Sequence, residues 1–195
     1  AYSVKSTPRG YWLEKGHTEE YAYAMEVLLN KFKQIIKKLR TGTADECIFI
    51  AFNPQDDEGN SDGDTAEHDD ILMPYWKELA NAIIHWSEYH ASENELEIVI
   101  VHIETPDAVL DVLRPAIIQS KVKYVGFTSD GTTKTWRLAE FIEDVVQTNH
   151  TMTGLGFSGV MLSNEEWTSI CNAIRIRNAQ SSIIDYFQLT ECFVG

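Results

Sequence analysis

Apolar side chains recur at helical spacing in five segments of the chain. In residues 76–83 and 167–174, Trp is followed by apolar residues at i+3, i+4 and i+7, and side chains at these offsets share one face of a helix. Similar faces occur in residues 25–32, 110–117 and 136–142. The pattern predicts five amphipathic helices, and it predicts that Trp76, Trp136 and Trp167 are buried where neighbouring helices meet.

Each predicted helix is followed by a short apolar segment with a common spacing. Hydrophobic residues occupy the first, fourth and sixth positions of residues 47–52, 96–101, 122–127, 152–157 and 184–189. The alternation predicts strands with one buried face, on which Ile50, Val99, Val101 and their equivalents point inward. Strict alternation of helices and strands with short connections predicts a parallel sheet.

The predicted strands repeat with a nearly constant period. From Ile50 onward, the steps between equivalent positions are 49, 26, 30 and 32 residues. The first step is longer by about the length of residues 55–70, which we interpret as an insertion between the first strand and the second helix. Helix–strand units with a period of about 30 residues are typical of a solenoid.

The registered strands and matched helices resemble the leucine-rich repeat, specifically the ribonuclease-inhibitor-like class with helices on the convex side. The resemblance covers about residues 20–195, with residues 1–19 as an N-terminal arm. It implies an α/β solenoid of about five helix–strand units whose parallel sheet lines the concave face. The family usually places Asn three residues after the last Leu of the strand. Here that position holds Gln55, Glu104, Asp130, Val160 and Cys192, so the turns must be satisfied otherwise.

In such a solenoid, recognition uses strand residues that point away from the core. The predicted partner-binding residues on this face are Phe49, Ile98, Ile100, His102, Tyr124, Thr128, Tyr186 and Gln188. Gly126 and Gly156 would adjoin and leave a shallow trough. Exposed aromatic side chains on a rigid face favour protein contact. The alternative is that the N-terminal arm, with Tyr11 and Trp12, covers the face.

Acidic residues are concentrated in the insertion. The 195-residue chain has 30 acidic and 16 basic side chains and a formal charge of −14, which argues against binding to nucleic acid or an anionic membrane surface. Residues 55–70 contain eight of these acids and no Lys or Arg, so the rest of the chain carries −6. The segment has no hydrophobic periodicity, which predicts an exposed loop that would attract a basic partner.

One window in the insertion follows the spacing of an EF-hand calcium loop. The candidate ligands, with Gly63 at the sharp turn, are Glu58, Asn60, Asp62, Asp64 and Asp69. Two positions depart from the motif, because Glu opens the loop and Asp69 is shorter than the usual bidentate Glu. A strand precedes the loop instead of a helix. These departures favour a solvated loop over a calcium site.

The remaining motifs do not assemble a catalytic or cofactor site. Residues 154–159 match G-x-G-x-x-G, but the glycines lie in a predicted strand, whereas dinucleotide binding needs them between a strand and a helix. Residues 149–151 match a glycosylation sequon by letter. The six histidines have no metal-ligand spacing, and the three cysteines are too far apart for a zinc knuckle. We therefore expect no cofactor and no catalysis.

These observations predict a non-catalytic protein–protein interaction module, an intracellular and cytoplasmic scaffold because an odd cysteine count fits a reducing compartment. The alternative is a doubly wound α/β enzyme, or a nucleotide- or metal-binding domain, with its site at the carboxyl ends of the strands. A solenoid keeps its strands in chain order, whereas a doubly wound sheet reverses. The last strand, in residues 183–194, would be a bare edge, which predicts a continuation, a partner or self-association there.

Overall fold

The structure, a computed structural model, describes residues 8–53, 65–91, 95–131, 137–180 and 183–194. Its helices are α1 (Pro8–Glu14), α2 (Glu19–Thr41), the short 3-10 helix η1 (Asp70–Leu72), α3 (Met73–Tyr89), α4 (Asp107–Gln119), α5 (Leu138–Thr148) and α6 (Asn164–Gln180). Its strands are β1 (Cys47–Ala51), β2 (Glu97–Val101), β3 (Tyr124–Thr128), β4 (Gly154–Ser158), β5 (Met161–Leu162), β6 (Tyr186–Thr190) and β7 (Phe193–Val194). The five predicted helices correspond to α2–α6, and α1 lies in the N-terminal arm.

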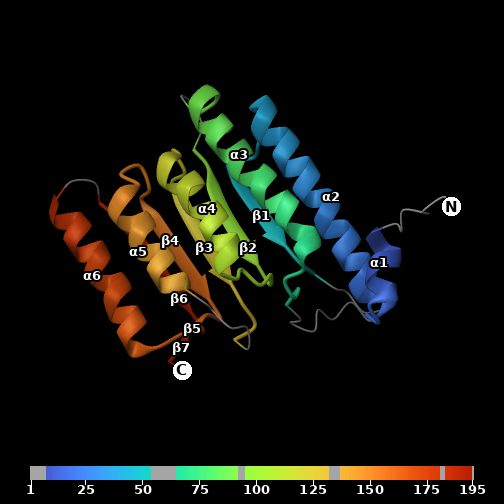
Figure 1. The fold of residues 1–195 in the computed structure, drawn as a ribbon. Coiled ribbons are helices and arrows are strands. Elements are labelled where there is room, and N and C mark those ends of the chain that lie inside the picture. Colours follow the sequence, from blue (N-terminus) through green and yellow to red (C-terminus); the bar gives the residue numbers. More distant parts are fainter. Residues whose placement is uncertain (1–7, 54–64, 92–94, 132–136, 181–182, 195) are drawn as a thin grey trace.

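The five long strands form a parallel sheet in the order β1-β2-β3-β4-β6. The mixed α/β class and the parallel sheet are therefore confirmed. Helices α2 to α6 lie side by side in one layer against the sheet, and each packs on the next along the chain (Figure 1). Among the described strands the order does not reverse, so the doubly wound alternative is wrong.

The register of the sheet corrects the predicted facing of β2. Ile98 and Ile100 pair with Ile48 and Ile50 of β1, and each is 3% exposed beneath the helices. The sequence-based alignment had placed Ile98 and Ile100 on the outer face, with Val99 inward. Residues 98–101 are all β-branched and apolar, so the sequence does not show which of them face the core. A shift of one residue in register turns every side chain of the strand to the opposite face.

On the face of the sheet that packs against the helices, one row of side chains is buried on β1 to β4 and exposed on β6. Ile50, Ile100, Phe127 and Phe157 share a row and are 0–6% exposed, whereas Leu189 of β6 continues this row and is 49% exposed. Edge strands with exposed apolar side chains invite pairing. The expectation that a partner or a second copy adds to this edge stays a prediction.

The residue that follows each of strands β1 to β4 donates a main-chain hydrogen bond to the last residue of the next strand in the sheet. The N–H of Phe52 donates to Val101 O at 3.0 Å, and that of His102 donates to Thr128 O at 2.9 Å. Ser129 and Gly159 continue the series by donating to Ser158 O and Thr190 O. These bonds supply the unit-to-unit connection that an Asn ladder provides in the family resembled.

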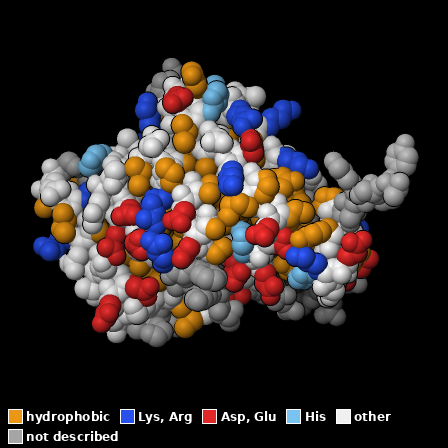
Figure 2. All heavy atoms as spheres, in the orientation of Figure 1, with side chains coloured by type: hydrophobic (Ala, Val, Ile, Leu, Met, Phe, Trp, Pro, Cys, Tyr) orange, Lys and Arg blue, Asp and Glu red, His pale blue; other side chains and the backbone are white. Residues whose placement is uncertain are grey.

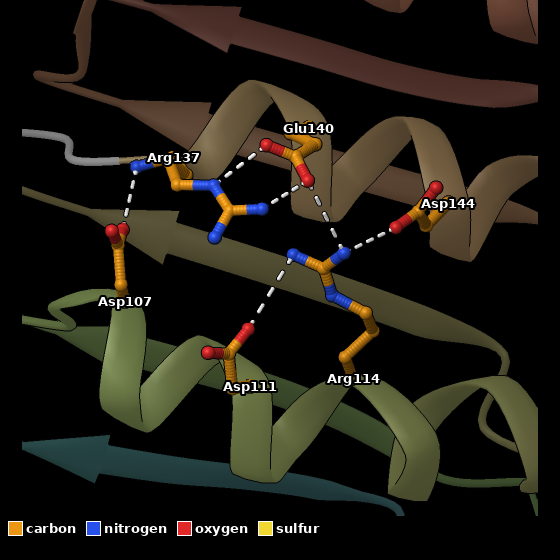
Figure 3. Close-up of polar contacts among 6 residues, drawn as sticks. All are labelled: Asp107, Asp111, Arg114, Arg137, Glu140 and Asp144. Carbon is orange, nitrogen blue, oxygen red and sulfur yellow. Dashed lines mark hydrogen bonds and ion pairs between the residues drawn. The ribbon is translucent and has the colours of Figure 1, made fainter.

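Charged side chains join the outer surfaces of α4 and α5 (Figure 3). Arg114 of α4 lies beside Asp144 and within 3.5 Å of Glu140 on α5. Glu140 also pairs with Arg137, whose backbone N–H donates to Asp107 of α4 at 3.2 Å. The shared carboxylate couples two neighbouring helices, so ion pairs as well as apolar packing hold the helix layer together.

The described part of the N-terminal arm packs on the helix layer. Trp12 of α1 is 1% exposed and meets the Tyr21 ring of α2 edge to face at 6.0 Å. Tyr11 donates through its hydroxyl to Asp69 at 2.9 Å. Residues 8–18 therefore do not cover the outer face of the sheet, which was the alternative considered for the arm.

The end of the acidic insertion is packed, contrary to the prediction of a wholly exposed loop. Ala66 is buried and forms a parallel bridge with Ile103, just beyond β2. Asp69 caps η1 by accepting from the N–H of Ile71 at 3.0 Å, and it pairs with Lys15. Burial would raise the pKa of Asp69, but the bonds from Ile71, Lys15 and Tyr11 outweigh it and hold this pKa below its usual value.

Candidate binding surface on the sheet

The sheet has an outer face, opposite the helices, built from three rows of side chains. We define the outer sheet face by these rows, which are Cys47, Glu97, Tyr124, Gly154 and Tyr186; Phe49, Val99, Gly126, Gly156 and Gln188; and Ala51, Val101, Thr128, Ser158 and Thr190. Phe49 is 50% exposed and Tyr186 is 52% exposed. Large apolar rings on five hydrogen-bonded strands form a rigid surface for contact.

Most of the predicted contact residues lie on this face. Phe49, Tyr124, Thr128, Tyr186 and Gln188 belong to its rows. Predicted contacts Ile98 and Ile100 do not, because their side chains are in the core. His102 lies just beyond β2 with a φ of 53°, and its Nδ1 is buried with no hydrogen-bond partner among the described residues.

The prediction missed Cys47, Glu97 and Val99 as members of the face. Glu97 was the signal that could have found them, since a charged residue in an apolar strand points to solvent. Once Glu97 is assigned outward, the two-residue period places Val99 and Val101 outward as well.

Tyr124 fills much of the trough predicted over the glycines. A Cβ at Gly154 would lie 2.7 Å from Cδ2 of Tyr124, and a Cβ at Gly156 would overlap the Tyr124 hydroxyl. At Gly126 the corresponding Cβ would lie 3.0 Å from Cε1 of the same ring. The ring therefore lies across the sheet above three glycines, which are needed for its close approach.

The described residues form a larger and a smaller hollow on the outer sheet face. The larger, which we call the sheet hollow, has a volume of about 440 Å³ and is lined by Cys47, Phe49, Glu95, Glu97, Val99, Lys123, Tyr124, Thr153, Gly154 and Tyr186. The smaller has about 220 Å³ and includes Gly126, Gly156, Thr128, Ser158, Gln188 and Thr190. The Tyr124 ring separates them, since it borders both.

Cys47 and Tyr124, which line the sheet hollow, favour their neutral forms. Burial, and then the charge of Glu97, raise the pKa of the Cys47 thiol to about 11. Burial, and then the neighbouring Tyr186 and Glu97, raise the pKa of Tyr124. A thiol that stays protonated at neutral pH is a poor nucleophile, so the hollow is suited to binding and not to thiolate chemistry.

Just beyond the carboxyl ends of β2 and β3, where the enzyme alternative would have part of its site, acidic side chains bond to Thr65 and His68. Glu104 accepts from the N–H of His68 at 2.9 Å, and Asp130 accepts from the Thr65 hydroxyl at 2.8 Å. Gly154 and Gly156 of the glycine motif lie in β4 as predicted, whereas Gly159 follows the strand with a φ of 63°. The end of the insertion thus packs over this edge of the sheet.

The calcium hypothesis stays a prediction, because four of its five candidate ligands are not described. Glu58, Asn60, Asp62 and Asp64 lie outside the described residues. Asp69 is described, and its carboxylate is bonded to Tyr11, Lys15 and the N–H of Ile71. Within the described ranges no group of three or more His, Cys, Asp or Glu side chains could hold a metal ion.

A further hollow of about 430 Å³ lies on the opposite side of the molecule, between α2 and α3. Ile36, Pro74 and Tyr75 give it an apolar lining, and Lys33 and Lys37 border it. Figure 2 shows basic and hydrophobic side chains gathered together over these helices. Its charge is opposite to that of the sheet hollow, so the two surfaces would favour different ligands.

Of the described helices, none is long and apolar enough to cross a bilayer. A comparison of the chain with protein-family models found no match, and a comparison with curated proteins found no significant one.

Proposed function

We propose that this chain is a non-catalytic protein-interaction module, a divergent leucine-rich-repeat-like solenoid that binds a protein partner on its outer sheet face. The strand order supports the solenoid, since consecutive units pair directly from β1 to β6. The level register of the five strands and the single helix layer support it as well. The proposal includes a scaffold role in a reducing compartment, because an odd cysteine count fits such a compartment.

The observation that carries the proposal is a rigid face with half-exposed aromatic rings. Phe49 and Tyr186 lie on the same face of the sheet, on its opposite edge strands β1 and β6, and each exposes about half of its surface. Among the described residues, no helix covers this face. Aromatic side chains contribute large contact area at low cost in side-chain entropy, which is why they dominate binding energy at protein interfaces.

Affinity capture from the source cell tests this proposal with a matched pair of variants. The double substitution Phe49→Ala/Tyr186→Ala is expected to abolish capture of the partner, because it removes two anchors from the outer sheet face. The control is Tyr23→Ala/Tyr89→Ala, which removes rings that are 57% and 68% exposed on the helix side. Quantitative mass spectrometry of the captured proteins gives the measurement.

The outcome separates the two faces of the molecule. A partner retained by the control and lost with the sheet variant supports the proposal. Equal capture by both variants, with thermal unfolding unchanged in each, would place binding elsewhere and contradict it.

The acidic insertion is a second candidate surface, supported by its eight acids without a compensating base. Because residues 65–70 pack against the sheet edge, deleting the whole segment would disturb the fold. Neutralising Asp56, Asp57, Glu58, Asp62 and Asp64 to Asn or Gln removes five charges and leaves residues 65–70 intact. For a basic partner, we expect weaker capture and a flatter dependence on salt, measured by repeating the capture between low and high ionic strength.

A further inference from the structure

The sheet hollow combines aromatic rings with two glutamate carboxylates that form no ion pair among the described residues. The Tyr124 and Tyr186 rings lie 5.9 Å apart between centroids and are inclined by 52°, so they contact each other and together line one side of the hollow. Phe49 lines the same hollow from β1. A ring face carries the negative end of its quadrupole and attracts a cation placed above it.

The charges bordering the sheet hollow have a negative sum. Glu95 and Glu97 line it together with a single cation, Lys123. Within the described ranges neither glutamate forms an ion pair, and Glu97 is an exposed member of the outer row. The pKa of Cys47 is raised by burial and then by the charge of Glu97. The pKa of Tyr124 is raised by burial, then by Tyr186 and then by Glu97. The contribution of Glu97 to both pKa values agrees with a negative charge at the hollow.

An arginine side chain matches this arrangement better than the other basic side chains. Its guanidinium is planar and can stack on an aromatic ring while its edge donates two hydrogen bonds to a carboxylate. A lysine ammonium is compact and strongly hydrated, so it gains less binding energy from contact with two aromatic rings. The hollow between α2 and α3, bordered by Lys33 and Lys37, would repel either cation.

We infer that the sheet hollow receives an arginine of the protein partner, whose guanidinium packs against the exposed ring surface of Tyr124 and Tyr186 and pairs with Glu97. This inference rests on the proposed function, because it assigns the chemistry of the partner that docks on the outer sheet face. Charge complementarity favours this occupant, since the chain is acidic overall and the hollow is negative where its rings are exposed. The smaller hollow, lined by Thr128, Ser158 and Gln188, would then contact the polar backbone beside that arginine.

The test uses a minimal probe on the full chain. N-acetyl-arginine methylamide is titrated into labelled protein and followed by amide chemical shifts, with N-acetyl-citrulline methylamide as the uncharged isostere. We expect the arginine probe to shift amides of β1, β2, β3 and β6 around the hollow, and to bind at least about fivefold more tightly than the citrulline probe.

Two variants assign the contacts. Glu97→Gln is expected to reduce arginine affinity to the level of citrulline, and Tyr186→Ala to weaken it by roughly two- to fivefold. Glu88→Gln is the matched control, since Glu88 is an exposed glutamate on α3. It is expected to leave the titration unchanged.

Failure of the inference can be told apart from failure of the proposed function. Equal binding of arginine and citrulline, or arginine binding that Glu97→Gln leaves unchanged, overturns the inference, and the proposed function still stands if Phe49→Ala/Tyr186→Ala abolishes partner capture. If that double variant captures the partner normally, the proposed function fails and the inference about the partner's arginine fails with it. Capture that is lost with both the double variant and Glu97→Gln supports both.

Discussion

Replacing Trp76 by alanine is expected to lower the free energy of unfolding by about 3–5 kcal/mol. Trp76 is fully buried in α3, and its ring meets the Phe32 ring of α2 edge to face at 4.8 Å. Truncation removes a large apolar surface and leaves a cavity at the junction of two helices that pack along most of their length. Urea unfolding followed by far-ultraviolet circular dichroism measures the loss.

The matched control for Trp76 lies on the same helix. Tyr89 is 68% exposed, so Tyr89→Ala is expected to change stability by less than about 0.5 kcal/mol. A cost below about 1 kcal/mol for Trp76→Ala would mean that the α2–α3 junction relaxes around the cavity, and would contradict the packing described for this layer.

The helix layer was predictable because its signal is long and periodic. Trp76 and the apolar residues that follow it mark a buried face of α3, whereas Trp167 is partly buried and Trp136 lies outside the described residues. The predicted helices are those of α2 to α6. The detail failed where the face is narrow: in α6 the buried residues are Ile170, Ala173 and Arg177, whereas Cys171, predicted on the same face, is exposed. A terminal helix with one uncovered side needs only a thin apolar stripe.

The facing of β2 was not predictable from hydrophobicity alone. Four of the five residues of β2 are Ile or Val, so hydrophobicity does not show which face of the strand is buried. Only Glu97 indicates which face points to solvent. The predicted contact residues were therefore wrong on this strand, because they included Ile98 and Ile100 instead of Glu97 and Val99. The electrostatic character of the sheet hollow came to light only once that register was known.

The packing of residues 65–70 left no pattern in the sequence for a different reason. Ala66 is held by main-chain bonds, from its N–H to His102 O at 2.8 Å and from the N–H of Glu104 to Ala66 O at 2.9 Å. Main-chain bonding of this kind does not depend on side-chain type. Composition therefore described the charge of the insertion correctly but not which part of it joins the sheet.

Replacing Asn149 by alanine is expected to cost about 2–4 kcal/mol, because one buried amide serves four main-chain groups. Asn149 is 1% exposed, and its Nδ2 donates to Ile117 O at 2.7 Å and to Ser120 O at 3.2 Å. Its Oδ1 accepts from the N–H groups of Thr151 and Met152 at 2.9 and 3.1 Å. The amide thus fastens the turn between α5 and β4 to the end of α4, and its removal leaves these groups buried without a partner.

Urea unfolding again measures the effect, with Asn172→Ala on the exposed side of α6 as the control that is expected to stay within about 0.5 kcal/mol. Asn149→Asp tests the donors separately, since aspartate keeps the acceptor oxygen and places a carboxylate against Ile117 O and Ser120 O; it is expected to be at least as destabilising as alanine. Stability unchanged in both variants would contradict the role assigned to the amide.

Because the same Nδ2 is the atom that a glycan would modify at the sequon of residues 149–151, we also expect the folded chain to resist glycosylation there.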